Sequence, residues 1–153
     1  MNNPFAAEDF DVQDSRGDHY AAMPPVTKIL RLEGLGYMAV ALALYYALGF
    51  SWLQFAIWFL LPDIAILVYL FASPTIGAHA YNLTHSSLGA AVVGIVGILT
   101  GSMVCYQIAL IWFAHIGFDR ALGYGLKYYL GFRVTHLGVI KGMRSKGSEQ
   151  PST

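Results

Sequence analysis

The chain has 153 residues, 56% of them apolar and only 12% charged, and its nine basic and nine acidic side chains leave no net charge. An average soluble domain carries about twice this fraction of charged residues, and a nucleic-acid-binding domain is expected to be basic. The single cysteine, Cys105, excludes an intrachain disulfide. The composition therefore predicts one domain of an integral membrane protein and excludes nucleic acid as a partner.

The two ends of the chain are polar. Residues 1–27 include several acidic side chains and have no apolar core of the kind that a signal peptide needs. We expect residues 1–27 and residues 141–153 to be disordered tails, and either Met1 or Met23 to be the true start. Residues 28–140 remain as the folded transmembrane domain.

Four apolar runs lie within this domain, at residues 29–48, 52–71, 85–100 and 103–122. A membrane-spanning helix needs about 20 residues, and the third run reaches that length only if it begins near Tyr81. Turn-forming residues at 49–51 and 100–102 predict two tight hairpins, and Ser73-Pro74 predicts a longer loop over residues 72–82. The expected fold is therefore all-α, a four-helix integral membrane bundle with short hairpin connections.

The basic residues predict how this bundle is oriented. Neither tight hairpin contains lysine or arginine, whereas both flanks of the domain do. Because cytoplasmic segments of membrane proteins carry an excess of these residues, both termini and the 72–82 loop are predicted to be cytoplasmic.

Few ionisable side chains lie inside the apolar runs. Between Glu33 and Asp119, Asp63 is the only acidic or basic residue other than histidine. The predicted topology brings Asp63, His85 and His115 to the same end of the bundle as Asp119, and His115 and Asp119 share one helix face because they are four residues apart. Ionisable groups within a membrane are costly, so they are paired or functional. We expect one polar site at the cytoplasmic side.

Two carboxylates and two imidazoles form a plausible ligand set for a divalent metal. Histidine suits zinc and carboxylate suits manganese, so Asp63, His85, His115 and Asp119 are the predicted metal ligands for Zn or Mn. An open coordination position would hold an activated water. Glu33 or His136 would then act as a further ligand or as a general base.

Other readings stay open. The same residues could form a structural network of hydrogen bonds and ion pairs, in which Asp63 pairs with a histidine or with Arg120. The protein would then be a non-enzymatic membrane scaffold or an assembly subunit. It would form a homo-oligomer or belong to a larger membrane assembly. A transporter is a third possible function, but the sequence has no evident inverted repeat, which argues against it.

Several sequence blocks resemble the DUF4260 family of small bacterial integral membrane proteins of unknown function. These blocks are LRLEG (30–34), LLPD (60–63), YNLTH (81–85), WFAHIGFDRALGYGLKY (112–128) and GFRVTHLG (131–138). The resemblance covers about residues 28–140. It implies a multi-pass protein of the bacterial inner membrane, in contact with membrane lipids, and it implies no activity.

A looser resemblance concerns YdjM-type membrane-bound metal-dependent hydrolase-like proteins. Blocks similar to theirs occur here in the same order, as LPDIA (61–65), THSS (84–87) and HIGFD (115–119). The resemblance implies that the aspartates and histidines of these blocks bind metal, and it suggests hydrolysis of a lipid or another amphiphile. Two departures are Ala65, where that group tends to have a second aspartate, and the segment 81–83, where it tends to have His-Arg-Gly.

Overall fold

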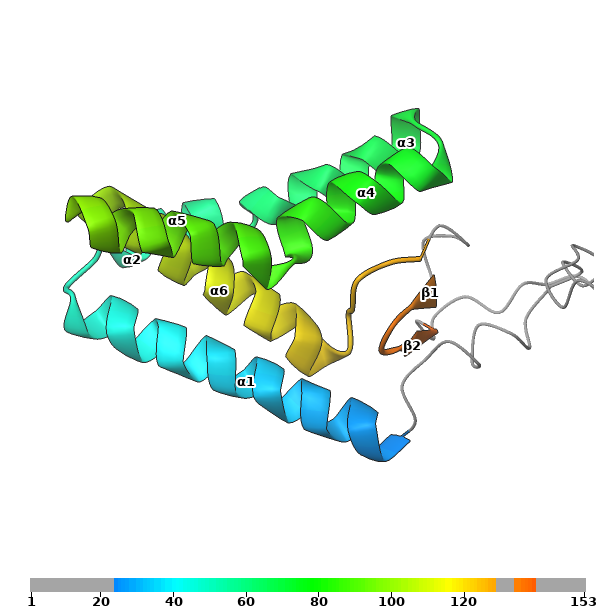
Figure 1. Cartoon of the computed structure of the whole chain (residues 1–153), viewed down its shortest axis with the longest axis horizontal. Coiled ribbons are helices and arrows are strands. Elements are labelled where there is room, and N and C mark those ends of the chain that lie inside the picture. The colour runs from blue at the N-terminus through cyan, green and yellow to red at the C-terminus, as the bar shows by residue number, and fades with distance from the viewer. Residues whose placement is uncertain (1–23, 129–133, 140–153) are drawn as a thin grey trace, which may run out of the picture.

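A computed structural model describes residues 24–128 and 134–139 of the chain (Figure 1). These residues form four helical segments and a two-stranded hairpin, so the predicted all-α fold is confirmed apart from four residues of strand. The elements are α1 (Pro24–Ala47), α2 (Trp52–Phe59), the 3₁₀ helix η3 (Leu61–Leu67), α3 (Val68–Phe71), α4 (Pro74–His85), α5 (Ser87–Thr100), α6 (Met103–Leu122), β1 (Val134–Thr135) and β2 (Gly138–Val139).

Helix α6 is the centre of the fold and lies between α1 and α5 (Figure 1). Small residues let α1 and α6 approach closely, as in many membrane helix pairs. A Cβ atom on Gly34 would lie 2.6 Å from Cβ of Arg120, and one on Gly117 would lie 2.6 Å from the Gly34 carbonyl oxygen. This crossing fixes the depth of α6, which carries two of the predicted ligands.

The two tight hairpins occur where they were predicted. Gly49 follows α1 and Gly101 follows α5, and their φ angles of 68° and 67° lie in the left-handed region that favours glycine. Ser102 then caps α6, since its side chain accepts a hydrogen bond from the Cys105 amide.

The loop predicted over residues 72–82 was wrong, because most of it forms α4. Ser73 is the N-cap of this helix, and its hydroxyl accepts a hydrogen bond from the Ile76 amide at 3.4 Å. Pro74 occupies the first helical position, where proline is favoured because its missing N–H needs no partner. The Ser-Pro pair therefore starts a helix rather than a loop.

The third helical segment is broken at Ser86, whose ψ of 142° is extended. His85 therefore ends α4 instead of starting the following helix, and α4 and α5 point in different directions (Figure 1). The break leaves the Thr84 carbonyl without a following helical amide, and the Trp112 indole of α6 donates a hydrogen bond to it. The second segment is interrupted in a comparable way, since α2 ends at Phe59 and Pro62 lies in the first turn of η3.

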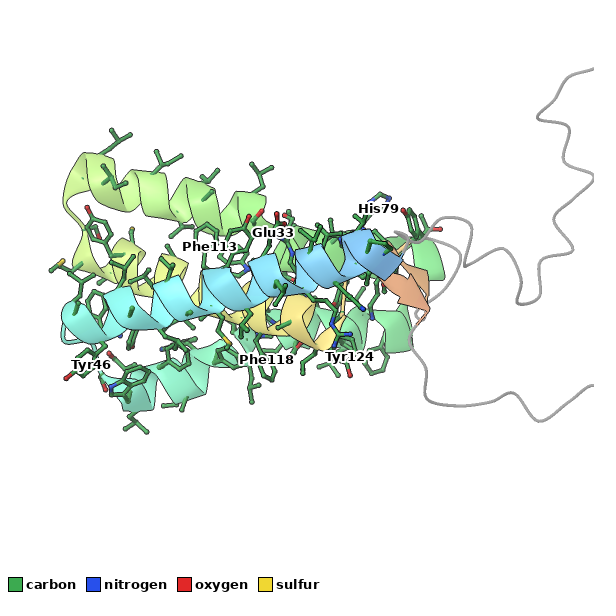
Figure 2. The ribbon with its side chains drawn as sticks, turned by 90° about the horizontal axis from the view of Figure 1, so that it is seen from below. Glu33, Tyr46, His79, Phe113, Phe118 and Tyr124 are labelled. Carbon is green, nitrogen blue, oxygen red and sulfur yellow. The ribbon has the colours of Figure 1, made fainter. Side chains whose placement is uncertain are left out.

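Two helical stretches, Pro25–Ala47 and Thr75–Thr100, are long and apolar enough to cross a membrane, and Trp52–Leu67 is a shorter apolar stretch. Many large apolar side chains are exposed, such as Leu99 at 79% and Tyr46 at 75%, and Figure 2 shows such side chains along the outside of the helices. Exposed apolar surface of this extent is typical of a membrane or protein contact. These features suggest a membrane protein.

The segment after α6 folds back onto the bundle. Gly123 ends α6, Lys127 forms an antiparallel bridge with Thr135, and β1 pairs with β2. Helix α1 begins at Pro24, inside the predicted N-terminal tail. The predicted tails at residues 1–23 and 141–153 lie outside the described residues.

Candidate metal centre

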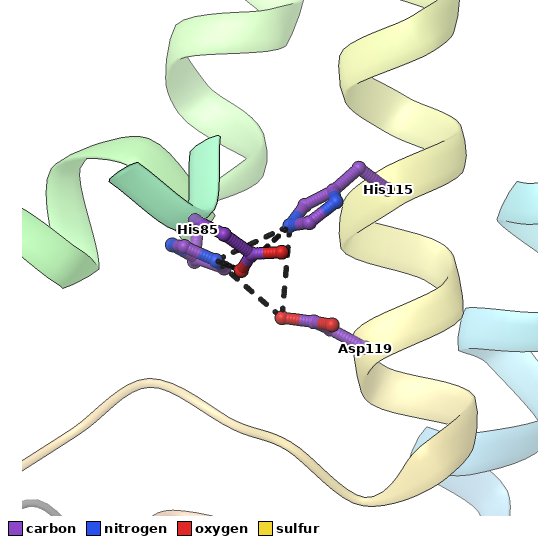
Figure 3. Close-up of side chains that lie close together, drawn as sticks. His85, His115 and Asp119 are labelled. Carbon is purple, nitrogen blue, oxygen red and sulfur yellow. Dashed lines mark hydrogen bonds and ion pairs between the residues drawn. The ribbon is translucent and has the colours of Figure 1, made fainter. Parts of the chain in front are cut away.

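Four predicted ligands from three elements meet in one cluster, here called the His/Asp cluster (Figure 3). Asp63 comes from η3, His85 from the end of α4, and His115 and Asp119 from successive turns of α6. Each residue offers one ligand atom, and these atoms all lie within 4.8 Å of one another. The predicted meeting of these four side chains is therefore confirmed.

The spacing of the ligand atoms fits a small four-coordinate ion. His85 Nε2 lies 3.4 Å from Asp63 Oδ1, 3.5 Å from Asp119 Oδ2 and 3.2 Å from His115 Nε2. His115 Nε2 lies 3.6 Å from Asp63 Oδ1 and 3.8 Å from Asp119 Oδ2. In a tetrahedral site with zinc–ligand distances of about 2.0 to 2.2 Å, neighbouring ligand atoms lie about 3.3 to 3.6 Å apart. The five distances that involve a histidine are close to these values, and all four atoms lie within 4.8 Å of one another, so the donor set could hold a divalent ion.

The tautomer of His85 is set by its surroundings. Its Nδ1 lies 3.0 Å from the Tyr81 carbonyl oxygen and 2.9 Å from the Thr84 hydroxyl. A carbonyl oxygen only accepts hydrogen bonds, so Nδ1 carries the proton in this contact. The neutral ring then presents the Nε2 lone pair to the cluster, which is how a metal-binding histidine is held by a backbone carbonyl.

His115 is the most enclosed member of the cluster, with a side chain 1% exposed. Its Nε2 faces the Nε2 of His85, and its Nδ1 is buried with no hydrogen-bond partner among the described residues. Because His85 Nε2 carries a lone pair and no proton, the two nitrogens approach closely only if His115 Nε2 carries a proton or if a cation lies between them. Both arrangements explain the distance of 3.2 Å between the two nitrogens, but one is a hydrogen bond and the other is a metal site.

Tyr81 supports two members of the cluster and was missed by the sequence reasoning. Its ring stacks on that of His85, with centroids 3.7 Å apart and planes inclined by 8°. Its hydroxyl donates a hydrogen bond to Asp119 Oδ2 at 3.3 Å, the oxygen that also faces both histidines. Tyr81 and His85 are four residues apart, so a helical reading of residues 74–85 would have placed them on one face.

Lys127 brings a positive charge near the cluster. The Asn82 side-chain amide fixes its backbone, donating to the Lys127 carbonyl at 2.8 Å and accepting from its N–H at 2.7 Å. The ammonium nitrogen lies 4.1 Å from the centroid of the Tyr81 ring. Burial lowers the pKa of Lys127 to about 8, while the charges of Asp119 and Asp63 act in the opposite direction.

The structure does not bring Glu33 or His136 into the His/Asp cluster. Glu33 is exposed on α1, and neither residue belongs to the metal-ligand group found among the described residues. His136 Nδ1 accepts a hydrogen bond from the Leu126 amide at 2.9 Å, and burial lowers the pKa of His136. His136 thus holds the segment after α6 in place. Proton transfer by these two residues stays a prediction.

A cavity of about 440 Å³ has walls from α2, η3, α4 and α6. None of the four cluster residues lines it, but Pro62 precedes Asp63 and Thr84 precedes His85 in the chain, and Ile111 lies one turn before His115. This volume is within the usual range of small-molecule sites.

Comparison with known families agrees with the sequence blocks described above. The family described as Domain of unknown function (DUF4260) matches residues 27–140, which is most of the chain. No curated protein and no solved structure matches the chain. The His/Asp cluster and the helices that carry it lie within the matched region, and the chain belongs to the DUF4260 family.

Proposed function

We propose that this protein is a multi-pass protein of the bacterial inner membrane that binds one divalent metal ion, zinc or manganese, in the His/Asp cluster. The observation that carries the proposal is the close approach of the four ligand atoms, with both histidine nitrogens 3.2 to 3.8 Å from each other and from the two carboxylate oxygens, together with the His85 tautomer that points a lone pair at the cluster. Two carboxylates would balance the charge of a divalent ion, which lowers the free-energy cost of burying the site in an apolar fold.

We further propose metal-dependent hydrolysis of a lipid or another amphiphile. A bound divalent ion would supply Lewis-acid activation of a carbonyl or phosphoryl group and would lower the pKa of a water. Access is from the side of Asp63, whose side chain is 38% exposed, compared with 14% for Asp119. Asp63, His85, His115 and Asp119 would hold the ion, and Asp63, the most exposed of the four, would lie on the side from which a substrate approaches.

Residues around the cluster would position such a substrate. Tyr81 holds Asp119, and Lys127 adds a positive charge beyond the Tyr81 ring. With a divalent ion, two carboxylates and Lys127, the site would carry a net positive charge. It would therefore favour a substrate with an anionic head group.

The runner-up is a membrane scaffold or assembly subunit in which the cluster is structural. The observation in its favour is the distance of 3.2 Å between the two Nε2 atoms, which suits a hydrogen bond from His115 to His85. In that case the cluster needs no metal and stabilises the packing of α4 on α6.

Metal analysis separates the two functions. The protein would be purified in mild detergent without chelator, and its metal content measured by elemental mass spectrometry for the wild type, His115→Ala and Asp63→Asn. The matched control is His79→Ala, because His79 is exposed on α4 outside the cluster. We expect near-stoichiometric metal in the wild type and in His79→Ala, and loss in the other two variants. A wild-type protein that binds neither zinc nor manganese would refute the metal site, and the scaffold function would then be the one supported.

The proposed topology places both termini in the cytoplasm. Fusions of a reporter that is active only in the cytoplasm, made at each end of the full chain, are expected to be active. An inactive reporter at either end would overturn this orientation without bearing on the metal site.

A further inference from the structure

The cavity beside the His/Asp cluster is elongated and mainly apolar. Along α6 its lining runs from Val104 to Trp112, a rise of about 12 Å. Its floor includes Ile111, which is 4% exposed, and its rim includes Ile108, which is 47% exposed. The cavity is therefore a groove with a buried floor that opens along one side.

Two polar crosslinks lie along this groove. At the end near the cluster, the Thr84 hydroxyl donates a hydrogen bond to the Pro62 carbonyl at 3.3 Å, one residue away from both His85 and Asp63. One turn before Ile111 along α6, the Gln107 amide donates to the Gln54 side chain at 2.7 Å and so joins α6 to α2. Apart from Gln107, the α6 residues that line the groove from Val104 to Trp112 are apolar, which suits a hydrocarbon chain.

The Gln54–Gln107 crosslink is held in position by further hydrogen bonds to α1. Gln107 also donates to the Tyr45 hydroxyl at 2.9 Å, and Tyr45 of α1 is completely buried, with its ring against Phe55 of α2. Tyr45 in turn donates to the Ser51 carbonyl at 2.7 Å. This chain of hydrogen bonds ties the wall of the groove at Gln54 and Gln107 to α1.

We propose that this groove binds the alkyl chain of a single-chain amphiphile, with the polar head toward Asp63 and the chain running along α6 toward Gln54 and Gln107. The inference deepens the proposed function, on which it rests for the role of the head group. The groove itself is formed without any metal. Binding of the chain can therefore be tested on metal-free protein.

The test is photolabelling of the purified full chain in mild detergent. The probe is a long-chain fatty acid that carries a diazirine within its chain and an alkyne for detection, and the labelled peptides are identified by mass spectrometry. We expect saturable labelling of residues 54–62 and 104–112 that unlabelled fatty acid competes away. Ile108→Trp is expected to fill the groove and to lower labelling about tenfold, which corresponds to about 1.4 kcal/mol of binding free energy.

The matched control is Ile98→Trp, because Ile98 is 66% exposed on α5 and does not line the groove. It is expected to leave labelling unchanged. Val104→Trp, at a rim position 64% exposed, gives a second groove variant that is not expected to disturb folding. Labelling spread over all exposed apolar faces, or lowered equally by Ile98→Trp and Ile108→Trp, would overturn the groove as a binding site.

The same labelling distinguishes this inference from the proposed function. It is repeated with chelator present, and it is expected to persist. Retained labelling in a protein that never binds metal would refute the metal centre and support the groove. A metal-loaded protein without specific labelling would refute the groove alone.

Discussion

Tyr81 lies flat against His85, with ring centroids 3.7 Å apart, while its hydroxyl reaches Asp119 on the neighbouring helix. One side chain thus orients a histidine of α4 and a carboxylate of α6 at the same time. It links the two helices within the His/Asp cluster, so its removal is expected to affect both His85 and Asp119.

Tyr81→Phe keeps the stacked ring and removes only the hydrogen bond to Asp119. We expect metal affinity to fall about 10- to 100-fold, the usual effect of losing a group that orients a ligand. Competition with a metallochromic chelator measures the affinity. Tyr46→Phe is the control, because Tyr46 is 75% exposed on α1. Equal affinity of Tyr81→Phe and the wild type would show that Asp119 needs no support from Tyr81.

Removing metal from the wild type is expected to lower its Tm in detergent. A ligand present at a hundredfold excess over its Kd stabilises the folded state by about 2.7 kcal/mol, and a chelator cancels this stabilisation. His115→Ala should not respond to chelator because it has lost the site. If chelator leaves the wild-type Tm unchanged while His115→Ala still lowers it, the cluster stabilises the fold as a hydrogen-bond network.

Gly117→Ala is expected to destabilise the protein by about 1 to 3 kcal/mol, since the added methyl would overlap the backbone of α1 at Gly34 and Met38. The shift of α6 should also weaken metal binding. Gly36→Ala, on α1 with open space around its Cα, is the matched control and is expected to be neutral or slightly stabilising. Thermal unfolding of the two variants in the same detergent gives the comparison. Equal stability of both would refute a tight α1–α6 crossing.

Asn82→Ala removes both hydrogen bonds that fix the Lys127 backbone. The Lys127 amide, which donates to Asn82 Oδ1 at 2.7 Å, is expected to exchange its hydrogen faster by about two- to tenfold. Hydrogen-exchange mass spectrometry of the peptide containing residues 123–128 measures this change. Amides within α1 serve as the internal reference and should keep their rates. Unchanged exchange at Lys127 would mean that the bridge to Thr135 holds this segment without Asn82.

Much of the candidate site could be predicted because ionisable residues are so few in the apolar runs. Asp63, His85, His115 and Asp119 stand out for this reason, and the cost of burying them predicts that they meet. The failure at residues 72–82 has a local cause, since Ser-Pro suits both the start of a loop and the N-cap and first position of a helix. Periodicity in a short polar stretch did not decide between them.

The sequence by itself determined the helical segments outside residues 72–82, the glycine turns at Gly49 and Gly101, and the four side chains that meet in the His/Asp cluster, because these depend on local conformational preference and on burial cost. Only the tertiary structure decided that Tyr81 stacks on His85, that Asn82 holds Lys127, and that His136 faces Leu126. Those contacts depend on the break at Ser86 and on the depth at which α6 crosses α1. Both are fixed by close packing between segments far apart in the chain, which local sequence does not encode.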